Sequence, residues 1–166
     1  MAGNISKESL EQEIVKIEKS NQHNHSLIII KGKNISDKER FLVYYDERWD
    51  CKLFLSYKTQ DRNNEAAIID QVCADLQLDK KELSIRYVTS RVQEKYSVSH
   101  DEYRIYNHRL YELEIHNWQK ENEEDFSINE KHYYWMTIPE MEQDENIVKK
   151  NIEVVDFVKE AMDTPF

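Results

Sequence analysis

Residues 63–79, which read NNEAAIIDQVCADLQLD, decide the fold of this 166-residue chain. Four apolar side chains recur there at helical spacing: Ile69, Val72, Cys73 and Leu76. Asn63 or Asn64 can cap the start of the helix, because a short side-chain oxygen accepts a hydrogen bond from the free amides of the first turn. The stretch therefore predicts one amphipathic helix in the middle of the chain.

Short β-like runs lie on both sides of this helix. Before it the pattern predicts strands at residues 27–30, 39–45 and 49–57, the last two joined as a hairpin. After it we expect two long strands that pair as an antiparallel ribbon, at residues 83–98 and 103–115. A single helix among antiparallel strands is typical of an α+β protein.

The chain then returns to short strands and ends in a helix. Residues 126–128 and the aromatic-rich residues 131–138 predict two more strands. Residues 144–162 predict one final helix that Asp144 caps. Its apolar side is expected to carry five residues: Ile147, Val148, Ile152, Val155 and Val158.

The N-terminal region differs from the rest in its pattern. Residues 6–20 predict a helix whose narrow stripe (Leu10, Ile14 and Ile17) suits packing on a single neighbour, such as a partner chain. Residues 21–24 read as a linker, where His23 and His25 are expected to be solvated. We therefore divide the chain into a helix and linker at residues 1–25, a possible connector, and one domain at residues 26–166.

Composition excludes several functional classes. The net charge of −10 argues against binding a nucleic-acid polymer, which needs a basic surface, but leaves room for a local pocket for a small anion. The only glycines, Gly3 and Gly32, cannot form a glycine-rich phosphate loop.

Cys51 and Cys73 lack metal-site spacing and are expected to be buried thiols of a reducing, cytoplasmic setting. No apolar run approaches the roughly 18 residues of a membrane span, so we expect no membrane insertion by this chain.

The order of elements over residues 27–162 resembles a Nudix fold. The run YWMTIPEM at residues 134–141 is similar to the aromatic strand and helical turn late in that fold. The resemblance implies an α/β/α sandwich around a mixed, mostly antiparallel sheet, with the family's signature helix after a hairpin. Residues 63–79 occupy the place of that helix.

The family signature reads G-x5-E-x7-R-E-U-x-E-E-x-G-U, where U is a bulky aliphatic residue. Its carboxylates lie on one helical face, where they can hold Mg²⁺ for diphosphate hydrolysis. At residues 70–78 the aliphatic positions Val72 and Leu78 match, and Asp75 is the one acid at a glutamate position. Departures from the signature include Ser56, Arg62, Asp70, Gln71 and Ala74. We therefore expect a degenerate signature with no catalytic residue, metal or cofactor.

Four runs are similar, more specifically, to the SMODS-associated Nudix-like domains of bacterial antiphage signalling systems. They are RYVTSR at residues 86–91, KYSVS at 95–99, YNHRLY at 106–111 and YYWM at 133–136. The resemblance implies a domain that recognises a cyclic nucleotide made by a companion nucleotidyltransferase. Some members carry two transmembrane helices ahead of the domain, and residues 6–20 would then connect to a missing membrane part at the cytoplasmic face of the inner membrane.

Strand alternation indicates where a ligand would bind. Asn107 and Arg109 lie mid-strand between apolar ends, and the preceding strand shows a similar change from Tyr87 to Arg91. An unpaired buried charge is very costly, so each arginine either pairs with a carboxylate or receives an anion. A guanidinium suits phosphate, and Tyr87 and Trp135 can stack on a base. The predicted ligand site is Arg91, Arg109, Asn107, Tyr87 and Trp135.

Three functions remain open at this point. The first is a non-hydrolytic module that binds a cyclic oligonucleotide or another small nucleotide in antiviral signalling. The second is a divergent Mg²⁺-dependent hydrolase of nucleoside-diphosphate-linked substrates, in which Asp75 would hold the metal. The third is a protein-interaction scaffold that forms a homo-oligomer through its first helix.

Overall fold

A seven-stranded mixed sheet, in the order β4-β5-β1-β3-β2-β7-β6, forms the centre of the computed structural model, which describes residues 22–97 and 101–163. The strands are β1 (Gln22–Ile29), β2 (Arg40–Asp46), β3 (Cys51–Lys58), β4 (Leu83–Ser97), β5 (Glu102–Ile115), β6 (Asp125–Ile128) and β7 (Lys131–Thr137). The β1–β5 pair is parallel, and the other pairs of this described sheet are antiparallel.

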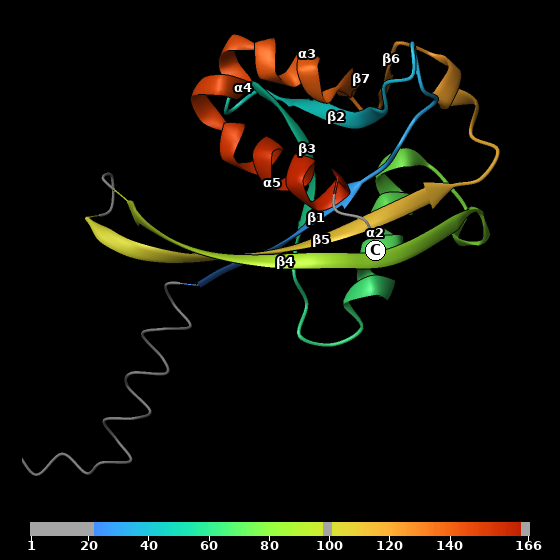
Figure 1. Ribbon diagram of the computed structural model, residues 1–166. Helices are drawn as coiled ribbons and strands as arrows, with labels where there is room; N and C mark the ends of the chain where they lie inside the picture. The colour runs from blue at the N-terminus through green and yellow to red at the C-terminus, as the bar shows by residue number, and fades with distance from the viewer. Residues whose placement is uncertain (1–21, 98–100, 164–166) are drawn as a thin grey trace, which may run out of the picture.

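Helices cover both faces of this sheet (Figure 1). They are α2 (Asn64–Leu76), α3 (Ile138–Gln143), α4 (Glu145–Lys150) and α5 (Ile152–Asp163), with 3-10 turns at η1 (Lys80–Glu82) and η2 (Gln119–Asn122). Alternation along β1 and the residue that follows it sends Ile28 and Ile30 toward α2, and Leu27 and Ile29 toward α5. We call these the α2 face and the α5 face. The predicted α/β/α sandwich with a mixed, mostly antiparallel sheet is confirmed.

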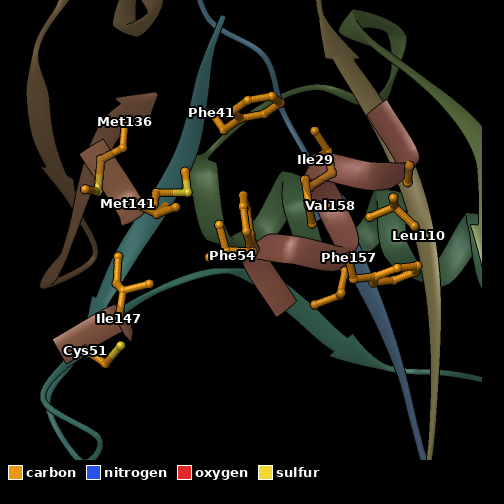
Figure 2. Packing of buried hydrophobic residues seen from close by; sticks show 14 residues of the cluster. Ile29, Phe41, Cys51, Phe54, Leu110, Met136, Met141, Ile147, Phe157 and Val158 are labelled. Atoms are coloured by element: carbon orange, nitrogen blue, oxygen red, sulfur yellow. The ribbon is translucent and has the colours of Figure 1, made fainter. Parts of the chain in front are cut away.

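The α5 face buries the core side chains that the C-terminal helices contribute (Figure 2). Phe157 and Val158 of α5 pack over Ile29 of β1 and Leu110 of β5. Burial of such side chains contributes roughly 1.5–3 kcal/mol each to folding. This packing fixes α5 over the β1–β5–β4 side of the sheet.

Helix α2 forms where the sequence predicted it, but its start differs. The predicted asparagine cap is wrong, because Asn63 has a left-handed backbone (φ 53°, ψ 41°) and makes no capping hydrogen bond. Asn64 is buried instead, one helical turn before Ile68. The helix ends at Gln77, whose backbone is also left-handed (φ 57°, ψ 52°).

The final helix is two helices, which corrects the single helix predicted at residues 144–162. Asp144 caps α4 as predicted, because its Oδ1 accepts from the Ile147 amide at 3.0 Å. The helical path breaks at Asn151 (φ −146°, ψ 13°) before α5 begins. Val148 is 44% exposed on α4, so it does not belong to the apolar side as predicted.

Strand β1 includes the residues that read as a linker. Residues 22–24 pair with β5, and His23 and His25 are half-buried on the sheet, so the prediction of a solvated loop is wrong. Neighbouring strands satisfy the backbone of β1, and this pairing overrides the polar sequence. The predicted helix at residues 6–20 and the end of the predicted strand at residue 98 lie outside the described residues. No helix of the described chain is long and apolar enough to cross a membrane.

Candidate functional site

A bulge in β4 places the two predicted arginines on opposite faces of the sheet. The ribbon pairs β4 with β5 as predicted, but β4 gains one residue relative to β5 between Tyr87 and Thr89. Alternation changes phase there, because side chains point to opposite faces in turn. Arg109 therefore lies on the α2 face, and Arg91 lies on the α5 face, where its guanidinium carbon is 5.8 Å from the ring centroid of Phe157.

Three of the predicted residues gather on the α2 face: Tyr87, Asn107 and Arg109. Asn107 and Arg109 alternate along β5 with Tyr111, whose hydroxyl contacts α2. The Tyr87 ring meets the Tyr111 ring edge-on, with 5.7 Å between centroids. We call Tyr87, Asn107 and Arg109 the strand triplet.

The strand triplet carries polar groups that the protein leaves unused. Arg109 is half-buried, and no described residue forms a hydrogen bond or ion pair with its guanidinium. The Asn107 Oδ1 atom is buried without a hydrogen-bond partner among the described residues. An unsatisfied buried acceptor costs about 1–3 kcal/mol, so this oxygen favours a ligand that donates to it. Tyr87 is 48% exposed, which leaves part of its ring free for contact.

Asn64 fixes the edge of this site. Its Nδ2 donates to Ser26 Oγ at 3.0 Å and to Tyr111 Oη at 3.1 Å, and its Oδ1 accepts from the Gln60 amide at 2.8 Å. Ser26 lies beside Arg109 in the β1–β5 register. These bonds hold the start of α2 against the strands that carry the triplet.

Sequence reasoning missed Asn64 and Ser26. The spacing of Asn64, Ile68, Val72 and Leu76 holds the available signal, because every fourth residue of α2 faces the sheet. A polar residue at the first of these positions indicates a buried hydrogen-bond network.

The fifth predicted residue, Trp135, lies in the core instead of beside the triplet. It is 6% exposed, and its Nε1 donates to the Lys120 carbonyl oxygen at 3.0 Å. Its ring packs edge-on against Trp118, and a Cβ at Gly32 would lie 2.8 Å from its Cε3. The structure thus brings together three of the five predicted residues, and separates Arg91 and Trp135 from them.

Asp75, the acid retained from the signature, is already engaged. Its Oδ2 accepts a hydrogen bond from the Tyr57 hydroxyl at 2.7 Å. Burial, followed by this hydrogen bond, holds the pKa of Tyr57 far above its usual value, so the hydroxyl remains a donor. Elsewhere on α2, Asp70 pairs with Lys80 at 2.8 Å.

The described residues contain no group of three or more His, Cys, Asp or Glu side chains placed to hold a metal ion. The magnesium ion that a hydrolase of this fold implies therefore does not fit the side chains around Asp75.

The described chain is similar in fold to solved structures of Nudix proteins. Shewanella oneidensis NrtR matches with a TM-score of 0.56 at 7% identity, over 85% of this chain and 64% of that chain. The NUDIX domain of NrtR complexed with ADP ribose matches with 0.51 at 6% identity, over 85% and 88%. A C. elegans Ap4A hydrolase matches with 0.50 at 12% identity, over 82% and 96%.

Sequence comparison adds no closer relationship. No protein-family model matches this sequence, and no curated protein sequence matches it. At identities of 6–12% the structural likeness speaks to the fold alone. The described chain therefore has the fold of the Nudix proteins.

Proposed function

We propose that this protein binds a nucleotide without hydrolysing it, and that the nucleotide is a cyclic oligonucleotide messenger of a bacterial antiphage system. The strand triplet carries this proposal. Arg109 would bind a phosphate through its planar fork of N–H donors. The Asn107 oxygen would accept a hydrogen bond from a base amino group, and the Tyr87 ring would stack on a base.

The residues of α2 at the signature positions support binding without hydrolysis. Gln77 adopts a left-handed backbone at the position where the family signature has a glycine, which supports the alignment of residues 70–78 with the signature. In this alignment Gln71 and Ala74 replace the two glutamates, and the Asp75 carboxylate accepts from Tyr57. These side chains do not supply the carboxylate cluster that Mg²⁺-dependent hydrolysis requires.

The nature of the nucleotide rests on the sequence resemblance. The runs at residues 86–91 and 106–111, which resemble the antiphage domains, contain all members of the strand triplet. A half-buried arginine in a chain of net charge −10 favours a small anion over a long polymer. In this proposal the ligand is met in the cytoplasm, and residues 1–25 connect the domain to another part of a longer effector.

Calorimetric titration with a panel of cyclic di- and trinucleotides tests the proposal. We expect one of them to bind and to be recovered intact after incubation with Mg²⁺. Arg109→Gln should weaken that binding about tenfold or more, because it removes a charged phosphate contact. Arg48→Gln, an exposed arginine in the β2–β3 turn, is the matched control and should leave affinity unchanged.

Three outcomes contradict the proposal. Equal affinity of the wild type and the Arg109→Gln variant would remove the triplet as the site. Mg²⁺-dependent release of nucleoside monophosphate or phosphate that is lost in Asp75→Asn would establish the hydrolase alternative instead. Failure of the folded wild type to bind any member of the panel would overturn the ligand class.

A further inference from the structure

A row of four basic side chains crosses the α5 face, with one residue on each of four adjacent strands. Lys58 of β3 lies beside His25 of β1, His25 lies beside His108 of β5, and His108 lies beside Arg91 of β4. Adjacent strands are about 4.8 Å apart, so the row spans about 14 Å. We call Lys58, His25, His108 and Arg91 the basic row.

We propose that the basic row is a second anion-binding site, which takes a small molecule carrying two or more phosphate groups. The sheet itself separates the row from the strand triplet, because the two sets of side chains point to opposite faces. This inference is therefore independent of the proposed function.

The basic row lacks acidic partners in an acidic protein. The chain has 33 acidic and 23 basic residues, yet no described carboxylate forms a hydrogen bond or ion pair with any member of the row. Two acids on this face have other partners. Glu153 of α5 accepts from Gln93 Nε2 at 3.3 Å, and Glu102 accepts from Arg104 Nε at 3.1 Å.

Arg91 has N–H groups that a ligand could use. Its guanidinium carbon lies 5.8 Å from the centroid of the Phe157 ring, a cation–π contact that does not consume the N–H donors. No described acceptor takes its N–H groups. Arg91 is half-buried, so a phosphate there would be less screened by salt than at the surface. The planar fork matches phosphate oxygens in pairs, as a lysine ammonium does not.

The histidines add a dependence on pH. Burial lowers the pKa of His25, and His23 and Lys58 lower it further. Burial also lowers the pKa of His108, with smaller contributions from His25 and Arg91. Both imidazoles therefore become protonated below their usual range, and a bound polyphosphate would offset the repulsion that delays protonation. Affinity should rise as pH falls, with uptake of protons on binding.

Titration with inorganic triphosphate and with orthophosphate, at about pH 5 and about pH 8 so that the lowered histidine range is covered, tests this site. We expect triphosphate to bind more tightly than orthophosphate and more tightly at the lower pH. Arg91→Gln should weaken triphosphate binding about tenfold or more. Arg109→Gln on the opposite face and the exposed Arg48→Gln should both retain wild-type affinity for triphosphate.

Further variants keep the result independent of folding. His25→Gln/His108→Gln should abolish the pH dependence of triphosphate binding, and circular dichroism reports whether that variant folds. Lys58→Gln changes an exposed side chain, so it should fold normally and still weaken binding severalfold. Absence of triphosphate binding at both pH values would overturn the proposal, and so would equal affinity in the wild type and in Arg91→Gln.

Discussion

Arg109 of β5 and Arg91 of β4 lie on opposite faces of the sheet, and the two faces surround the charge differently. Arg109 on the α2 face lies beside Ser26 and among neutral polar groups that α2 holds in place. Arg91 on the α5 face lies beside His108 and over Phe157. One face thus offers a single cation with neutral hydrogen-bonding groups, and the other offers several cations in a line. The same residue type on the same strands therefore suits different ligands.

The largest effect should come from removing the ring that supports Arg91. Phe157→Ala leaves a cavity on the α5 face and should lower the free energy of unfolding by about 3–5 kcal/mol. Urea denaturation measures the change. Phe157→Leu keeps an apolar side chain of similar size, so it should retain most of the stability. A loss below about 1 kcal/mol in Phe157→Ala would mean that α5 does not depend on this contact.

A smaller loss is expected when the support of the α2 face is removed. Asn64→Ala leaves the Tyr111 hydroxyl and the Gln60 amide without their partner, and should lower the free energy of unfolding by about 1–3 kcal/mol. It should also weaken ligand binding at the strand triplet and leave triphosphate binding unchanged. Asn63→Gly is the matched control, because glycine tolerates the left-handed backbone there and no capping bond is lost. Equal stability of the two variants would contradict the role of Asn64.

The histidines should make the α5 face sensitive to mild acid. The pKa values of His25 and His108 are lowered in the folded state, so the unfolded chain takes up protons first as pH falls below about 6.5. Stability should therefore be highest above that pH and should fall as the pH drops toward the folded-state values. Below the folded-state pKa values the loss of stability from these histidines is complete and no longer grows as the pH falls.

The urea midpoint measured across this range checks the histidine effect. His25→Gln/His108→Gln should reduce the slope of the midpoint against pH. The control His132→Gln, on β7 beside Asp125, keeps His25 and His108 and should therefore keep their contribution to the slope. An unchanged slope in the double variant would show that other groups dominate the acid response.

The architecture was predictable from the sequence because periodicity reports burial. The pairing of the long ribbon and the presence of helix α2 follow from which side chains face the core, and both were confirmed. The buried stripe of α2 differs in part from the prediction, because Ile68, Val72 and Leu76 are buried while Ile69 and Cys73 are only half-buried. Strand β1 was predicted too short, since its polar start is held by backbone pairing with β5 and not by side-chain burial.

The site was less predictable, because it depends on local departures from regular structure. Strict alternation from Tyr87 would place Arg91 on the same face as Arg109. The bulge between Tyr87 and Thr89 changes this, and the residue types around Val88 do not indicate it. An aromatic residue in a strand, such as Trp135, reads alike whether its ring faces a ligand or the core. The pairing of strands decides both questions, and pairing is a long-range property of the chain.

The smallest effect is expected from deletion of Val88, which tests whether register alone positions Arg91. Without Val88 the strands can pair without interruption, and Arg91 stays opposite His108 because the register on both sides of the bulge is kept. Val88 is half-buried against the α5-face cluster, so its loss should cost about 1 kcal/mol, partly offset by the regular ladder. Triphosphate affinity should stay within about twofold of the wild type, since the contact of Arg91 with Phe157 is retained. Loss of triphosphate binding in a folded deletion variant, with binding at the strand triplet intact, would show that the local twist of the bulge is itself needed to aim Arg91.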